Sequence, residues 1–64
     1  MTPIEMLDEL RKSWRVGVFK HPDNGDAVVE LYAPDDCLDL QARYVEPQLT
    51  RAIARAWAGE PSDG

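Results

Sequence analysis

The sequence has few of the residues that build catalytic, metal or disulfide sites. Its 64 residues include one cysteine, Cys37, and one histidine, His21. A single cysteine cannot form a disulfide within the chain, and in a small protein it indicates a reducing compartment. We expect Cys37 to be a small packing residue rather than a nucleophile, because His21 is the only imidazole that could serve as its base. The spacing of Cys and His ligands that zinc requires is also missing.

Long apolar runs and excess positive charge are missing as well. No segment approaches the roughly 20 apolar residues of a membrane span. The opening residues MTPIEMLDEL are acidic and amphipathic, unlike a signal or transit peptide. Twelve acidic residues against seven basic ones give a net charge of −5. This charge disfavours direct binding to nucleic acid or anionic lipid. It favours a basic protein partner, or serves nothing more specific than solubility. We therefore expect a cytoplasmic protein without membrane contact.

Residues 14–33, WRVGVFKHPDNGDAVVELYA, predict a β-hairpin. The pair Asn24-Gly25 suits a two-residue type I′ turn, which needs a positive φ at both positions. That turn would place Val18 opposite Leu31. Because side chains alternate along a strand, the hairpin has one apolar and one mixed face. The apolar face carries Trp14, Val16, Val18, Val29, Leu31 and Ala33, and the mixed face carries Arg15, Phe19, His21, Val28, Glu30 and Tyr32.

Helices are predicted on both sides of the hairpin. Thr2 and Glu5 form a capping box around a helix that starts at Pro3. A second helix is predicted from Pro47 to about Ala58, ended by a glycine. Each helix has one apolar stripe. The first stripe contains Pro3, Leu7, Leu10 and Trp14, with Ile4 and Met6 beside it, and the second contains Leu49, Ala52, Ile53, Ala56 and Trp57. We expect the two tryptophans to be packing residues.

Residues 37–46 allow two interpretations. Alternation of Leu38, Leu40, Ala42 and Tyr44 with polar residues indicates a strand. The good helix formers in this stretch, with Asp35 or Asp36 as a cap, indicate a helix instead. We favour the strand, because three strands make a more stable sheet than two.

The predicted fold is therefore α+β: a helix, a three-stranded antiparallel sheet and a helix (αβββα), with both helices on the apolar face of the sheet. Residues 1–59 would form one domain, and residues 60–64 a disordered tail.

The carboxylates show no pattern that indicates catalysis or metal binding. Turn positions are normally hydrated, so their carboxyl groups lack the raised pKa that a general acid needs. Residues 23–26 partly match the start of a calcium loop, but the twelfth position, which should be Glu, is Pro34. Asp35, Asp36 and Asp39 could hold a divalent ion only loosely. We therefore expect a protein that is not an enzyme and needs no cofactor.

The remaining candidate for function is the surface. Aromatic and acidic residues are predicted on the mixed face and at the ends of the hairpin. The candidate partner-binding residues are Phe19, Asp23, Asp26, Glu30, Tyr32, Asp35, Asp36 and Asp39. Carboxylates on a rigid scaffold attract a basic surface and can imitate the phosphates of DNA. The alternative without a partner is a solvated sheet face whose aromatic residues only shield the sheet edge. The alternative function is a homodimeric structural or regulatory module, since so small a chain gains stability from association.

Three segments carry a resemblance: WRVGV at 14–18, APDD at 33–36 and PQLTRAIARAW at 47–57. With them, the chain resembles the small acidic α/β proteins encoded by phages and mobile elements. Some proteins of this type are anti-CRISPR inhibitors, and acidic ones occlude the DNA-binding surface of a Cas complex. The resemblance implies an inhibitor of a bacterial defence complex inside the host cell. It transfers no site residues, because such inhibitors share no common motif.

Overall fold

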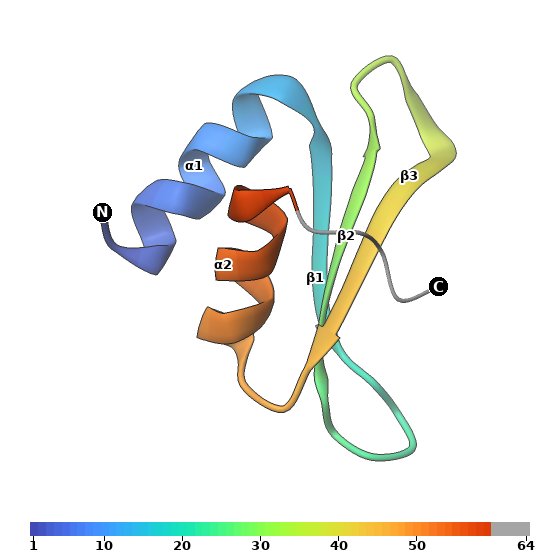
Figure 1. Ribbon diagram of the computed structural model, residues 1–64. Helices are drawn as coiled ribbons and strands as arrows, with labels where there is room; N and C mark the ends of the chain where they lie inside the picture. The colour runs from blue at the N-terminus through green and yellow to red at the C-terminus, as the bar shows by residue number, and fades with distance from the viewer. Residues whose placement is uncertain (60–64) are drawn as a thin grey trace.

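The chain folds as two helices packed on one face of a three-stranded sheet (Figure 1). The computed structural model describes residues 1–59. The elements are α1 (Pro3–Ser13), β1 (Arg15–Lys20), β2 (Ala27–Ala33), β3 (Asp36–Glu46) and α2 (Leu49–Ala58). The strands are antiparallel in the order β1-β2-β3. The αβββα prediction is therefore confirmed, with residues 37–46 in a strand. The predicted tail at 60–64 lies outside the described residues.

The start of α1 has the predicted capping box. The Glu5 backbone N–H donates to Thr2 Oγ1 at 3.2 Å, and the Thr2 N–H donates to Glu5 Oε1 at 3.0 Å. Leu10 is buried and Trp14 packs against the core, as the apolar stripe predicts. Ile4, at the edge of that stripe, is 73% exposed.

Helix α2 begins at Leu49, after Gln48 as N-cap, rather than at Pro47. Gly59 ends it in the left-handed conformation, with φ of 73°. Its buried residues, Ala52, Ile53 and Ala56, meet Leu10, Val29, Leu31 and Tyr44 in the core between helices and sheet. Leu49 and Trp57, predicted on the same stripe, are each 42% exposed. The stripe is therefore buried at its centre and open at its edges.

The predicted two-residue turn of the hairpin is wrong. Val16 lies opposite Leu31, so the loop comprises residues 22–25 and is closed by a 2.7 Å hydrogen bond from the His21 N–H to the Asp26 carbonyl. In the described residues Gly25 and Gly59 alone have positive φ, so Asn24 cannot complete a type I′ turn.

Local hydrogen bonds explain the wider loop. Pro22 follows His21 at the second position of the turn, which suits proline because its ring fixes φ. The Asn24 Oδ1 then accepts the Asp26 N–H at 3.0 Å, and the Gly25 N–H donates to the His21 carbonyl at 2.9 Å. The register differs from the predicted one by two residues. An even shift keeps every side chain on its face, so the predicted apolar and mixed faces are retained.

Strand β3 departs from the predicted alternation at its first half. Ala42 pairs with Leu31, but the next residue of β2, Tyr32, pairs with Leu40, so Gln41 is an extra residue in the ladder. Such a bulge bends a strand. Figure 1 shows this end of β3 splaying away from the helices. Leu38 is 88% exposed and Leu40 45% exposed, which corrects the prediction that the helices cover both.

Candidate functional site

The centre of the uncovered sheet face holds Glu30, a predicted partner-binding residue. Tyr32 Oη donates a 2.7 Å hydrogen bond to Glu30 Oε1, and Arg43 Nε lies 3.6 Å from Glu30 Oε2. The Glu30 side chain is only 13% exposed. Tyr32 and Arg43 thus compensate the charge of Glu30 within the fold, and little of the carboxylate is accessible to a partner. The hydrogen bond to Glu30 is the largest cause that raises the pKa of Tyr32 above its ordinary value of 10.0, and desolvation adds to the increase.

Phe19 lies near the C-terminal end of β1, beside the β1–β2 loop. It is 42% exposed and pairs with the fully buried Val28 on β2. Asp23 is exposed in the same loop, and Asp26 is half-buried at its end. This end of the sheet therefore combines one half-exposed aromatic residue with two carboxylates.

The opposite end of the sheet carries the other predicted aspartates. We call residues 34–40 the acidic tip. Asp35, Asp36 and Asp39 are all exposed there, together with Leu38 and Leu40. The sequence predicted these aspartates as partner-binding residues. It did not predict the exposed leucines, because regular alternation assigned Leu38 and Leu40 to the core.

Two hydrogen bonds support the acidic tip. Asp36 Oδ1 accepts the Leu38 N–H at 2.9 Å, which stabilises the turn into β3. Arg15 Nε on β1 donates to the Pro34 carbonyl at 3.2 Å and ties the base of the tip to the sheet. Cys37, expected to be a packing residue, is exposed in the tip. The tip therefore has ordered local contacts although its side chains face solvent.

The predicted carboxylates form two groups rather than one patch. The seven residues of β2 separate them, a span of about 23 Å at the usual rise per strand residue. Glu30 lies between the groups but is held by Tyr32 and Arg43. A partner of ordinary size would therefore engage one end of the sheet first.

Three other described carboxylates have basic neighbours, and Glu5 is held in the capping box. Glu9 Oε1 lies 2.8 Å from Lys12 Nζ, and Asp8 lies 3.8 Å from Arg11. Glu46 Oε2 lies 2.6 Å from Arg55 Nη1. Within the described part of the chain, the aspartates of the acidic tip have no ion-pair partner. The exposed aspartates without an ion-pair partner among the described residues thus lie at the two ends of the sheet.

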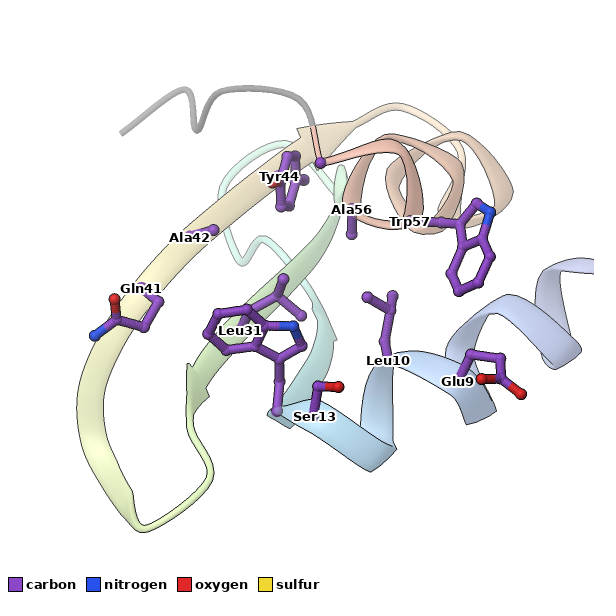
Figure 2. Close-up of a pocket in the computed structure, with 11 residues that line it drawn as sticks. Glu9, Leu10, Ser13, Leu31, Gln41, Ala42, Tyr44, Ala56 and Trp57 are labelled. Atoms are coloured by element: carbon purple, nitrogen blue, oxygen red, sulfur yellow. The ribbon is translucent and has the colours of Figure 1, made fainter.

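A pocket of about 520 Å³ lies on the helix side, between the two helices, β2 and the bent half of β3 (Figure 2). Its apolar lining includes both tryptophans of the chain with Leu10, Leu31, Ala42, Tyr44 and Ala56. Glu9, Ser13 and Gln41 provide polar groups. Trp57 is 42% exposed. Sequence reasoning assigned the tryptophans to packing and missed the pocket, because the pocket depends on the bend of β3.

Residues 1–59 contain no group of three His, Cys, Asp or Glu side chains arranged for a metal ion. None of the described helices is long and apolar enough to cross a membrane. Comparison with protein-family models, curated proteins and solved structures found no match.

Proposed function

We propose that this protein is a non-catalytic binding protein whose acidic tip engages a basic, nucleic-acid-binding surface of another protein. Following the resemblance to phage and mobile-element proteins, the partner is a bacterial defence complex in the host cytoplasm, and binding inhibits it. The observation that carries the proposal is the acidic tip, where three exposed aspartates, with no ion-pair partner among residues 1–59, lie beside the exposed Leu38 and Leu40.

The two kinds of residue in the tip have different physical roles. Unpaired carboxylates steer a basic surface into encounter and set specificity, while desolvated apolar contacts give much of the binding energy. Leu38, at 88% exposed, contributes nothing to the core. Its side chain is therefore free to enter an apolar recess of the partner, with the aspartates meeting a basic rim.

The test is affinity capture from the lysate of a bacterium with an active defence complex, followed by binding measurements with the purified partner. Wild-type protein is compared with the triple variant Asp35→Asn, Asp36→Asn, Asp39→Asn. We expect the variant to lose most of the affinity, and wild-type binding to weaken steeply with salt. The matched control is Asp23→Asn with Asp26→Asn at the other end of the sheet, which should retain affinity.

Competition separates DNA mimicry from other protein binding. Duplex DNA should displace the wild-type protein from its partner, because both occupy the same basic surface. Unchanged binding by the triple variant, or a partner that binds DNA and this protein together, contradicts the proposal.

A homodimeric module is the second candidate, and the exposed leucines on the edge strand β3 favour it. Self-association through the tip would, however, bring like-charged aspartates together. Sedimentation at high micromolar concentration decides between the two. A monomer excludes the homodimer, whereas a dimer that Leu38→Ser dissociates favours it.

A further inference from the structure

The pocket and the acidic tip are neighbours on β3. Gln41 and Ala42 line the pocket, and Leu40, the last residue of the tip, directly precedes Gln41. A partner seated on the tip therefore lies next to the β3 side of the pocket, and Trp57 and Glu9 lie on the other side (Figure 2). This inference rests on the proposed function and concerns which side chain of the partner the pocket receives.

The lining of the pocket favours a cation with an apolar stem. Trp14 and Trp57 line it, Glu9 provides a carboxylate, and no described Lys or Arg side chain lines it. Indole faces attract cations, and a carboxylate nearby adds to that attraction. Figure 2 shows Trp57 and Glu9 on facing parts of α2 and α1, with Leu10 beside them. Both groups therefore lie where one side chain can reach them.

Glu9 already has a cation, Lys12 Nζ, at 2.8 Å. That pair is on the surface, since the Lys12 side chain is 70% exposed. Exposed ion pairs of this kind are weak, so an incoming cation can replace Lys12 at little cost. The lysine thus acts as a competitor whose removal should strengthen cation binding.

We propose that the pocket is a receptor for an arginine side chain of the basic partner. The planar guanidinium stacks on the indole of Trp57 and donates to the Glu9 carboxylate, and its methylene stem lies on Leu10. Arginine suits this site better than lysine, because a guanidinium both stacks and forms directed hydrogen bonds. The tip of a second copy does not suit it, because three aspartates would approach Glu9.

The experiment uses the intrinsic fluorescence of the full chain, whose two tryptophans both line the pocket. The probes are acetyl-Ala-Arg-Ala-amide and the same peptide with citrulline, the neutral isostere of arginine. We expect a saturable change with the arginine peptide, and binding of the citrulline peptide that is weaker by about fivefold or more. Equal affinity for the two peptides, or no saturable response to the arginine peptide, overturns the proposal.

Three variants assign the contacts. Glu9→Gln should lower the preference for arginine over citrulline, and Trp57→Phe should weaken arginine binding while Trp14 still reports it. Lys12→Gln should tighten arginine binding. An unchanged arginine preference in both Glu9→Gln and Trp57→Phe overturns the proposed site.

The triple asparagine variant of the tip separates this inference from the proposed function. It should bind the tripeptide within about twofold of wild type at physiological salt, although it loses the macromolecular partner. If the peptide preference is present but the tip variant still captures the partner, the proposed function fails and the arginine pocket stands. If the peptides bind alike while the tip variant loses the partner, the pocket inference fails and the proposed function stands.

Discussion

The Tyr32 phenol donates a 2.7 Å hydrogen bond to the Glu30 carboxylate, two residues earlier on the central strand β2. Both side chains lie on the sheet face that no helix covers. Opposite Glu30 on β1 is Gly17, where an added Cβ would lie 3.8 Å from the Tyr32 ring. Gly17 therefore lies beside both side chains, and a Cβ at this position would meet the Tyr32 ring at an ordinary contact distance. Two residues that sequence reasoning assigned to partner binding thus hold each other.

This hydrogen bond predicts a pH dependence. The folded state raises the pKa of Tyr32, first through the bond to Glu30. Its stabilising contribution is therefore fully present below the ordinary pKa of 10.0 and is lost as pH rises through the raised value. Above pH 10, wild type should lose stability more steeply than Tyr32→Phe. Denaturant unfolding as a function of pH measures this, and parallel curves for the two proteins would refute it. NMR titration of the tyrosine rings should show the Tyr32 pKa moving toward its ordinary value in Glu30→Gln.

The elements of the fold could be predicted because each depends on local signals. Thr2 and Glu5 cap α1 through contacts three residues apart, and the apolar period of α2 is visible within one helix. The hairpin faces could also be predicted, although the turn was wrong, because a two-residue register shift preserves them. The faces of the strands, which alternate every two residues, and the apolar stripes of the helices, which repeat every 3.6 residues, could thus be predicted from the sequence.

The candidate site could be predicted only in part, because it depends on an irregularity. The irregular pairing of β3, in which Gln41 is an extra residue and Asp36 pairs with Ala33, departs from regular alternation, and no local signal in residues 37–46 marks it. It exposes Leu38 and Leu40, and it shapes the pocket beside Trp57. The tip aspartates are exposed, as expected for polar residues near the end of a strand, and their role in partner binding stays a prediction.

The ion pair between Glu46 and Arg55 should stabilise the junction of β3 and α2. The two side chains are 18% and 23% exposed, their closest atoms lie 2.6 Å apart, and the Arg55 guanidinium lies 5.7 Å from the centre of the Tyr44 ring. Arg55→Ala should lower the free energy of unfolding by about 1–2 kcal/mol. Arg51, at 3.8 Å from Glu46 and 71% exposed, is the matched control. Arg51→Ala should cost at most about 0.5 kcal/mol. Equal losses in urea unfolding would contradict the distinct roles of the two arginines.

Two isoleucines, one on each helix, should differ sharply in their effect on stability. Ile53 on α2 is 4% exposed in the core, whereas Ile4 on α1 is 73% exposed. Ile53→Ala should cost about 2–4 kcal/mol, because it removes buried methyl groups and leaves a cavity. Ile4→Ala should change stability by less than about 0.5 kcal/mol. Thermal unfolding followed by circular dichroism compares the two, and a large effect of Ile4→Ala would show that α1 buries a different face.

Gly25 and Gly17 provide a test of the revised hairpin. Gly25 has a φ of 75°, which L-residues rarely adopt, although no atom lies within 4 Å of an added Cβ. Gly25→Ala should therefore cost about 1 kcal/mol through backbone strain alone. Gly17→Ala should be nearly neutral, because its Cβ would meet Glu30 and Tyr32 at ordinary contact distances of 3.8 Å or more. If Gly17→Ala were the more destabilising change, the packing on the uncovered face would need revision.

The aspartates of the acidic tip should lower the stability of the fold. Asp35, Asp36 and Asp39 lie within five residues of one another and have no ion-pair partner among the described residues. Their mutual repulsion is relieved when all three become asparagine, and Asp36→Asn keeps a side-chain oxygen that can accept the Leu38 N–H. The triple variant should therefore unfold at a slightly higher temperature than wild type at low salt. The difference should shrink as salt is raised, because screening acts on exposed charges. A variant less stable than wild type at low salt would show that these carboxylates serve the fold, and would remove the main reason to assign them to a partner.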